Sequence, residues 1–232
     1  MADENLHKVE PVRSRLLTMP HGFLTARQSE HKRFDLISRG AEPVFVRQVH
    51  SARVLNVDKP FKGENIPEAD AMVTTHRALM LGIVTADCAP ILFEDVEAGV
   101  IGAAHAGWRG AQAGIAHATV SEMEKLGASR RAIRASIGPC IRQDSYEVDD
   151  AFREYFVFPQ DDEFFSAGRD GHWQFDLAGY VAAQLVELLG GDSVEIAGID
   201  TYANAEHFHS FRRATHLGKA SQGRQYSLIA IS

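Results

Sequence analysis

Three residues whose side chains are good ligands for a transition metal each lie at the end of a predicted strand. His50 ends the apolar stretch PVFVRQVH, Cys88 lies within VTADCAPILF, and His105 lies within GVIGAAHAGWRG. Two imidazoles and one thiolate would form a zinc site with a fourth position open to water or substrate. The positions match no local metal motif, so the residues alone leave another interpretation open. In that interpretation Cys88 is a small buried side chain and the two histidines cap strand ends.

A second group of residues is the turn AGWRG, which spans residues 106–110 and precedes a predicted helix. Glycines allow a ligand to approach the backbone closely, and the N–H groups at a helix start favour an anion. Arg109 adds donors that suit phosphate or carboxylate, and Trp108 offers a flat face to an aromatic base. The alternative is a tight turn between strand and helix, with Trp108 filling the core.

Asp87 stands beside Cys88 and could orient a histidine ligand or cap a turn. Cys88 and His105 would also suit nucleophile and base in a metal-free cysteine hydrolase, because a neighbouring histidine favours the thiolate. Arg27 and Arg47 are further candidates for binding phosphate. His21 is expected to border a pocket, and Cys140 is expected to be a buried thiol without a role. The expected substrate- and phosphate-binding residues are therefore Arg27, Arg47, Asp87, Trp108 and Arg109.

The composition restricts the class of protein. The chain has 232 residues, 45% of them hydrophobic and 24% charged, which is typical of a globular domain. A net charge of −7 argues against a general nucleic-acid binder, and the pairs Arg130-Arg131 and Arg212-Arg213 are short. No apolar run approaches the ~20 residues that span a bilayer. With a polar N-terminus and two cysteines, we expect no disulfide scaffold and a cytoplasmic location.

Apolar runs separated by turn residues predict strands in consecutive groups, with a few helices between them. Grouped strands favour an α+β sandwich over a doubly wound parallel sheet. We expect a loose arm over residues 1–15, a single domain over 16–232 and a loop over 159–173. The helix at 177–189 has Asp176 as its N-cap and Gly190 as its end. The predicted strands are 44–49, 52–57, 71–75, 79–85, 91–94, 100–105, 133–137, 194–199 and 226–231, and the other predicted helices are 111–126 and 148–156.

The motifs, taken together and in order, resemble the YfiH family, also called the laccase-domain or polyphenol oxidase family. They are HGFLTAR, RQVH, ADAMVTT, TADCAPILF, AAHAGWRG, IGPCI, YEV, SFRR and GRQYSLI, and they run from about residue 21 to residue 231. The resemblance implies a layered αββα sandwich. It also implies a zinc site formed by the histidine of QVH, the cysteine of ADC and the histidine of AHAGWRG, which are His50, Cys88 and His105 here.

Members of this family are described as purine nucleoside phosphorylases. The resemblance implies phosphorolysis of adenosine, inosine and methylthioadenosine, together with deamination of adenosine. An alternative is the editing of peptidoglycan precursors, to which some bacterial members are linked. The chain departs from the family pattern at Gln28–His31, at Arg142–Ser145 and at Asp200-Thr201, where the family has a Gly-Gly-Val-Ser type loop, further cysteines and a Cys-Thr pair.

Copper is the alternative metal. A multicopper centre needs many closely spaced histidine pairs, and only His207 and His209 lie two residues apart. Because Cys and His bind copper tightly, weak phenol oxidation is expected at most as a side activity. The expected partners are a purine nucleoside and phosphate, with neither nucleic acid nor a membrane.

Overall fold

The computed structural model describes residues 10–61, 65–220 and 223–231. Residues 1–9 of the expected N-terminal arm lie outside this part of the chain. The rest of that arm is tied down, because Val12 pairs with Phe23 through two backbone hydrogen bonds of 3.0 and 2.9 Å. Within the described ranges, no helix has the length and apolar character needed to cross a membrane.

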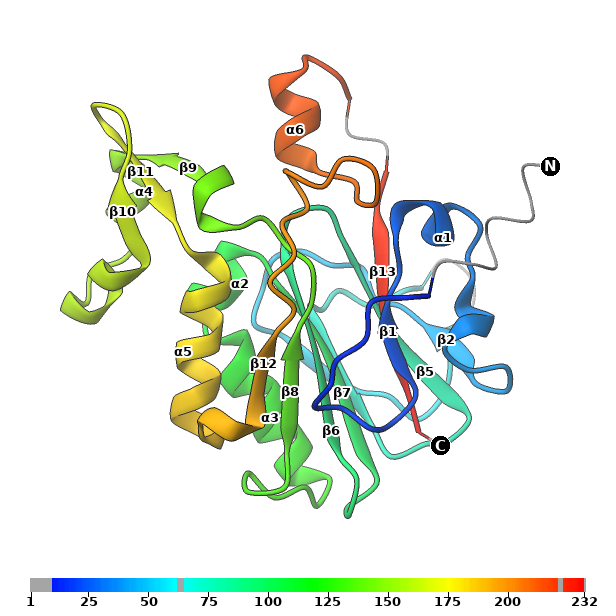
Figure 1. The fold of residues 1–232 in the computed structure, drawn as a ribbon. Coiled ribbons are helices and arrows are strands. Elements are labelled where there is room, and N and C mark those ends of the chain that lie inside the picture. Colours follow the sequence, from blue (N-terminus) through cyan, green and yellow to red (C-terminus); the bar gives the residue numbers. More distant parts are fainter. Residues whose placement is uncertain (1–9, 62–64, 221–222, 232) are drawn as a thin grey trace.

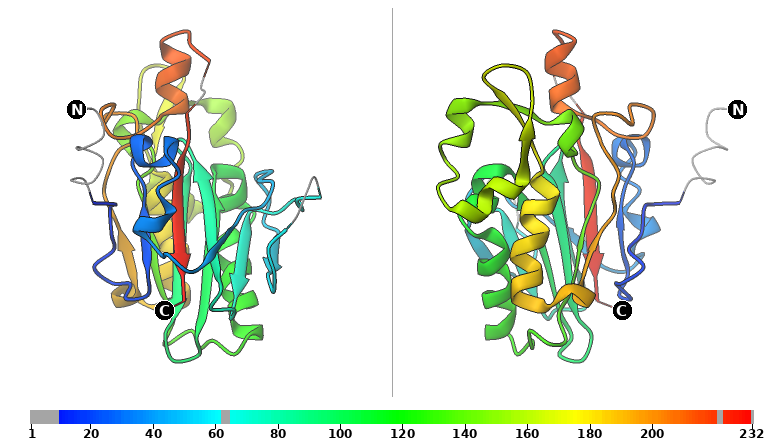
Figure 2. Two further views of the ribbon diagram at one scale, coloured as in Figure 1. Left: turned by 90° about the vertical axis from the view of Figure 1, so that its right-hand side faces the viewer. Right: turned by 60° about the vertical axis from the view of Figure 1, so that its left-hand side comes forward.

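Two β-sheets pack face to face in the centre of the molecule (Figures 1 and 2). In order across the six-stranded sheet, the strands are β12 (Val194–Ile196), β8 (Arg134–Ile137), β6 (Ala89–Asp95), β7 (Val100–Ala106), β4 (Ala71–Thr74) and β3 (Val54–Asn56). The four-stranded sheet consists of β1 (His21–Phe23), β13 (Gln225–Ala230), β5 (Leu79–Thr85) and β2 (Glu42–Val44). Both sheets mix parallel and antiparallel pairs.

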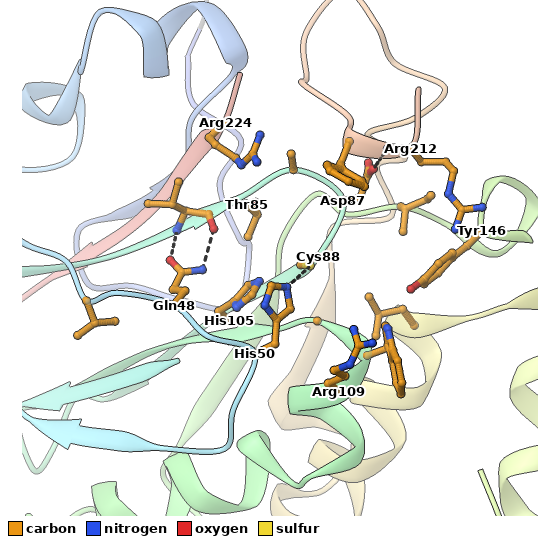
Figure 3. A pocket seen from close by; sticks show the side chains of 18 residues that line it. Gln48, His50, Thr85, Asp87, Cys88, His105, Arg109, Tyr146, Arg212 and Arg224 are labelled. Carbon is orange, nitrogen blue, oxygen red and sulfur yellow. Dashed lines mark hydrogen bonds between the residues drawn. The ribbon is translucent and has the colours of Figure 1, made fainter. Parts of the chain in front are cut away.

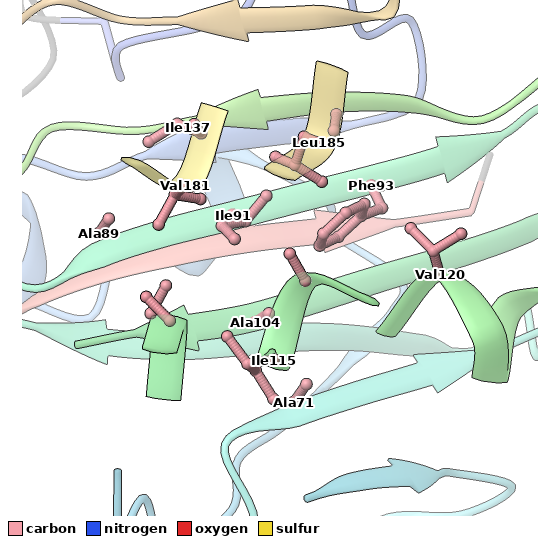
Figure 4. Packing of buried hydrophobic residues seen from close by; sticks show 14 of the residues in the cluster. Ala71, Ala89, Ile91, Phe93, Ala104, Ile115, Val120, Ile137, Val181 and Leu185 are labelled. Carbon is pink, nitrogen blue, oxygen red and sulfur yellow. The ribbon is translucent and has the colours of Figure 1, made fainter. Parts of the chain in front are cut away.

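Alternate residues of the central strands enter different apolar layers. In β6, Ile91 and Phe93 face the helices, whereas Leu92 packs between the two sheets. In β5, Leu81 points between the sheets and Met80 points to the opposite face. Since both faces of these strands are buried, their sequences are continuously apolar rather than alternating. Figure 4 shows the layer between the six-stranded sheet and its helices.

Helices cover the outer faces of both sheets. The six-stranded sheet is covered by α3 (Ile115–Lys125) and α5 (Leu177–Leu189), seen on one side in Figure 2. On the other side, α1 (Ala26–Glu30) and the 3₁₀ turn η1 (Phe34–Leu36) lie outside the four-stranded sheet. This layering confirms the predicted α+β fold. Helix α5 has the predicted bounds, and the Asp176 carboxylate accepts the Gly179 N–H at 3.0 Å as its N-cap.

The predicted helix at 111–126 is two helices, α2 (Trp108–Gln112) and α3. Gly114 between them has φ +84°, a left-handed conformation that interrupts the helix. The turn AGWRG is therefore itself partly helical. The predicted strands 44–49 and 52–57 are also shorter, since β2 ends at Val44 and β3 covers only Val54–Asn56.

The segment between β8 and α5 was predicted wrongly. Residues 148–156 form β9 (Glu147–Asp149) and the short helix α4 (Asp150–Arg153), which starts where the Asp149 carboxylate accepts the Phe152 N–H. The predicted loop at 159–173 contains the 3₁₀ helix η3 (Pro159–Phe164), β10 (Phe165–Ala167) and the start of β11 (His172–Phe175). A cluster of aromatic rings organises this region. Its members, Phe152, Phe156, Phe165 and Phe175, pack mostly in tilted and edge-to-face pairs with ring centroids 4.8–6.3 Å apart.

The remaining elements are short. They are η2 (Gln143–Ser145), η4 (Gly191–Ser193) and α6 (Phe211–His216). Helix α6 lies above the ends of the two sheets in Figure 1, on the same side of the molecule as the loops before β6 and after β7. The candidate site lies beneath it.

Candidate metal centre and active-site pocket

His50, Cys88 and His105 meet at one end of the two sheets. Their ligand atoms all lie within 4.8 Å of one another, and Cys88 Sγ is 3.9 Å from His50 Nε2. His105 lies in β7, Cys88 directly before β6, and His50 in a turn with φ +61°. The antiparallel register pairs Ala89 with Ala106. Cys88, one residue before Ala89, therefore lies opposite Gly107 and close to His105. Strand pairing therefore explains how residues far apart in sequence form one group.

A buried carboxylate, Asp70, organises two of these three residues. Its Oδ1 accepts a hydrogen bond from His105 Nδ1 at 2.8 Å and another from the His50 backbone N–H at 2.9 Å. Its Oδ2 accepts the N–H and the hydroxyl of Ser51 at 2.6 and 2.7 Å. Asp70 is fully buried. Because His105 uses Nδ1 for this bond, its Nε2 is left for a metal, as in many carboxylate–histidine–metal arrangements.

The sequence gives little sign of this role, since Asp70 reads there as a polar residue before a strand. The electrostatics of the site follow from its contacts. Burial opposes the charge on Asp70, but hydrogen bonds from His105 and Ser51 outweigh it and hold the pKa of this carboxyl well below its usual range. For His105, burial is outweighed by Asp70 and Cys88, which raise its pKa to about 9.

The same balance acts on Cys88. Burial favours the neutral thiol, but hydrogen bonds and charge from His105 and His50 lower the pKa of Cys88 to about 6. The thiolate, the form that binds a metal, is thus favoured at neutral pH. The other cysteine differs: burial raises the pKa of Cys140 to about 12, and this side chain is 1% exposed.

The glycines of AGWRG leave room for the three ligand residues to pack closely. A Cβ at Gly107 would lie 2.8 Å from His50 Cδ2 and 3.1 Å from Cys88 Sγ, and one at Gly110 would lie 3.0 Å from the Ser51 carbonyl oxygen. Both positions therefore need glycine so that the His50 turn can pack against α2. The close approach that the glycines allow is between two parts of the protein. A helix as short as α2 gives no separate support to an anion cradle.

The three donors fit zinc. Zn–S and Zn–N bonds of about 2.3 and 2.0–2.1 Å in a tetrahedral site put donors about 3.3–3.6 Å apart, close to the 3.9 Å between Cys88 Sγ and His50 Nε2. In residues 10–61, 65–220 and 223–231 this is the one group of three or more potential ligands. The same donors also bind copper.

A cavity of about 600 Å³ opens beside this group. Ligand pockets of small molecules commonly have this size. Its apolar wall includes Val46, Trp108, Ile141, Tyr146, Leu177 and Phe211. Its polar wall includes Gln48, Thr85, Asp87, Arg109, Arg212 and Arg224, which Figure 3 labels around the ligand group.

Three of the expected binding residues line this cavity. Trp108 and Arg109 do so from α2, with the Arg109 guanidinium 4.3 Å above the Trp108 ring centroid. Asp87 lines it too, but its carboxylate holds other parts of the chain. It accepts the hydroxyls of Thr201 and Ser210 at 2.7 and 2.9 Å and the backbone N–H of Arg212 at 2.7 Å. Asp87 thus fixes the start of α6, and Asp70 is the residue that orients a histidine.

The structure places the other two arginines outside the cavity lining. Arg47 forms an ion pair with Glu68 at 2.8 Å and is 66% exposed, and Arg27 is exposed on α1. His21 does not border the cavity either. Its Nδ1 donates to the Met19 carbonyl oxygen at 2.7 Å, while its Nε2 accepts the Ser14 N–H at 2.9 Å.

Sequence reasoning about local strand ends missed Tyr146, Arg212, Arg224 and Gln48. All four lie in motifs of the family resemblance, YEV, SFRR, GRQYSLI and RQVH, and that was the one signal for them. The side-chain amide of Gln48 pairs with the backbone of Val84 in β5. Its nitrogen donates to the Val84 carbonyl oxygen at 2.8 Å, and its oxygen accepts the Val84 N–H at 2.9 Å. This pairing anchors the chain shortly before His50.

Comparison with known proteins gives consistent results. The family model described as multi-copper polyphenol oxidoreductase laccase matches residues 26–232. A protein of Rickettsia prowazekii named purine nucleoside phosphorylase is 36% identical over 191 residues, which are 81% of this chain and 78% of that protein. A protein named adenosine deaminase, from an unknown prokaryotic organism, is 42% identical over 120 residues, 49% of this chain and 46% of its own.

Among solved structures, YfiH of Bacillus licheniformis superposes with a TM-score of 0.81 at 25% identity, covering 91% of this chain and 92% of its own. A Neisseria meningitidis protein assigned to the DUF152 family superposes with a TM-score of 0.74 at 28% identity, covering 89% of this chain and 81% of its own. The family match over residues 26–232 and the two solved structures lead to the same family assignment. The chain belongs to the YfiH family, whose model is described as multi-copper polyphenol oxidoreductase laccase.

Proposed function

We propose that this protein is a zinc-dependent purine nucleoside phosphorylase that acts on adenosine, inosine and methylthioadenosine and also deaminates adenosine. The observation that carries the proposal is the three-ligand group of His50, Cys88 and His105, which faces a cavity of about 600 Å³ lined by aromatic rings and arginines. The names of the relatives, purine nucleoside phosphorylase and adenosine deaminase, support the same reactions.

Zinc held by His50, Cys88 and His105 would supply a Lewis acid that activates water at neutral pH, which deamination of the purine requires. The chain's own part is to hold these ligands in place. Asp70 fixes the ring of His105 through Nδ1, and the two histidines keep Cys88 in its thiolate form. The third ligand, His50, lies in a turn whose backbone is held by a hydrogen bond from the His50 N–H to Asp70, so this ligand is already in position.

Phosphorolysis places different demands on the cavity. A phosphate oxygen forms a bond to C1′ of the ribose while the C1′–N9 bond breaks, and its electron pair leaves with the purine, which takes up a proton. Fixed cations near the phosphate stabilise the charge during this step. Arg109 lines the cavity and is our candidate for this role, and the rings of Trp108, Tyr146 and Phe211, which also line it, can pack against the flat purine.

The test is incubation of the purified, untagged protein with adenosine, inosine and methylthioadenosine, with and without phosphate. We expect free base only when phosphate is present, and inosine from adenosine without it. Metal analysis of the same sample is expected to give close to one zinc per chain. Cys88→Ala and His105→Ala should lose both metal and turnover, and full activity in either variant would contradict the proposal.

A second candidate is a metal-free cysteine hydrolase. The observation that favours it is the position of the Cys88 sulfur within 4.8 Å of an imidazole nitrogen of His105, a neighbour that also lowers the pKa of Cys88. A thiolate next to a histidine is the arrangement of a nucleophile with its acid–base partner. Hydrolysis that persists after metal removal and stops after alkylation of Cys88 would favour this function over the first.

A further inference from the structure

Three side chains with hydrogen-bond donors face the ligand group from one wall of the cavity. They are Arg109 on α2, Tyr146 just before β9, and Arg212 on α6. In Figure 3 the hydroxyl of Tyr146 points toward the side of the cavity where Arg109 lies, and Arg212 lies at the other end of the same ring. The three residues come from distant parts of the chain, so the fold alone brings them together.

Arg212 is held firmly in this position. Its backbone N–H donates to the Asp87 carboxylate at 2.7 Å, and its Nη1 donates to the Glu147 carbonyl oxygen at 2.6 Å. Its guanidinium carbon lies 5.3 Å from the centroid of the Tyr146 ring. These contacts fix the cation while leaving most of its five N–H donors for another partner.

The two guanidinium groups on this wall form no ion pair with a carboxylate of the described residues, although the Asp87 carboxylate accepts the Arg212 backbone N–H. Neither the Arg109 nor the Arg212 guanidinium lies within 4.0 Å of a carboxylate oxygen in the described part of the chain. Arg109 instead stacks on the Trp108 ring at 4.3 Å. Two arginines held beside one cavity without ion pairs are suited to bind an anion with several oxygens, such as phosphate.

Tyr146 lies between these cations and supplies a neutral donor. Burial raises the pKa of its hydroxyl, so the group stays protonated at neutral pH. Among the described residues no hydrogen bond from this hydroxyl is observed, whereas the backbone of Tyr146 is fully bonded: its N–H donates to the Gln143 carbonyl oxygen and its carbonyl accepts the Phe175 N–H, each at 3.0 Å. A protonated hydroxyl that faces a cavity can donate to an anionic oxygen without adding charge.

We propose that Arg109, Tyr146 and Arg212 form an oxyanion subsite that holds inorganic phosphate for attack on the nucleoside. This inference rests on the proposed function and names the residues that would bind its second substrate. The competing cation is Arg224, which lines the opposite wall of the cavity beside Thr85 (Figure 3). Substitution of Arg109 or Arg212 and substitution of Arg224 therefore distinguish which wall of the cavity binds phosphate.

The experiment measures binding of inorganic phosphate to the zinc-loaded protein by calorimetry, and the KM for phosphate with inosine as co-substrate. In Arg212→Gln and Arg109→Gln we expect the Kd for phosphate to rise roughly tenfold to hundredfold, the range for loss of a hydrogen bond to a charged group. Tyr146→Phe should raise it less. The KM for inosine should change much less than the KM for phosphate in all three.

Arg47→Ala is the matched control, because it removes the same charge outside the cavity lining. It should bind phosphate like the wild type. Wild-type affinity in both Arg212→Gln and Arg109→Gln, or a loss that appears in Arg224→Gln instead, would overturn the subsite. If Arg212→Gln unfolds because its bond to Glu147 is lost, Arg109→Gln and Tyr146→Phe still test the proposal, since neither side chain makes such a bond.

The two proposals fail in different ways. If phosphate binds and the substitutions weaken it, but no nucleoside releases base, the subsite stands and the proposed reaction fails. If base is released with phosphate while none of the three substitutions affects phosphate binding or its KM, the reaction stands and the subsite fails. Absence of any phosphate binding by the wild type contradicts the subsite directly.

Discussion

The carboxylate of Asp70 lies 2.8 Å from Nδ1 of His105 and, through the same oxygen, also accepts the N–H of His50. One buried side chain therefore fixes the ring of one candidate ligand and the backbone of another. Its own backbone carbonyl accepts the His105 N–H at 2.7 Å. The geometry of the metal centre thus depends on a residue that cannot reach the metal itself.

We expect Asp70→Asn to weaken zinc binding by about 10–100-fold, the effect of removing an orienting carboxylate behind a metal-binding histidine. An amide nitrogen cannot accept the hydrogen bonds that Ser51 or His105 now donate, so the ring and the turn both loosen. Competition with a chromophoric chelator gives the zinc affinity. Asp58→Asn, an exposed position, is the matched control and should bind zinc normally. Equal affinities in the two variants would contradict the role of Asp70.

Gly107→Ala is expected to lose zinc and activity while the protein remains folded. The added Cβ would lie 2.8 Å from His50 Cδ2 and 3.1 Å from Cys88 Sγ, so it displaces two ligands at once. Gly191→Ala is the control, because nothing lies within 4 Å of a Cβ there and its φ lies outside the left-handed region. Zinc content, turnover and the melting temperature are measured for both. Normal zinc content in Gly107→Ala would show that the ligands can shift without cost.

The sequence was sufficient to select the three candidate ligands because each follows or interrupts an apolar run. The structure brings all three together, although His50 lies in a turn six residues beyond the end of β2 at Val44. Asp70 could not be found in this way. Its importance depends on total burial and on contacts with Ser51 and His105, 19 and 35 residues away, which no local pattern contains.

The least predictable part of the fold is the region from β9 to β11, where tertiary packing outweighs local preference. Phe156, within the predicted helix, ends up against Phe175 with ring centroids 4.8 Å apart. Such contacts between residues distant in sequence decide where strand replaces helix or loop. Helix α5 was predictable because its cap, its apolar stripe and its terminating Gly190 all act locally.

We expect the stability of the protein to depend on pH through His21. Burial lowers the pKa of this imidazole in the folded state below its usual value of about 6.5. The unfolded chain therefore binds more protons in this range, so the free energy of unfolding falls as the pH drops below about 6.5 and recovers above it. Protonation of Nε2 would also remove its hydrogen bond from the Ser14 N–H.

Urea unfolding of the wild type and of His21→Gln, each at pH 7.5 and pH 5.5, measures this effect. The variant should be less stable at pH 7.5 but should lose less stability on acidification. Comparing the two pH slopes removes the contribution of other histidines, such as His209. Parallel slopes in the two proteins would exclude His21 as the source.

Alkylation separates the two candidate roles of Cys88. In zinc-free protein at pH 7, iodoacetamide should modify Cys88, whose pKa is lowered to about 6, and spare Cys140, which is buried. If Cys88 is a zinc ligand, stoichiometric zinc should block the reaction, because the bound sulfur is no longer a free nucleophile. Mass spectrometry of tryptic peptides locates the label, with Cys88→Ala as the unlabelled control. Rapid alkylation of Cys88 in the zinc-loaded, active protein would instead support a free catalytic thiolate, since a coordinated sulfur could not react at the same rate.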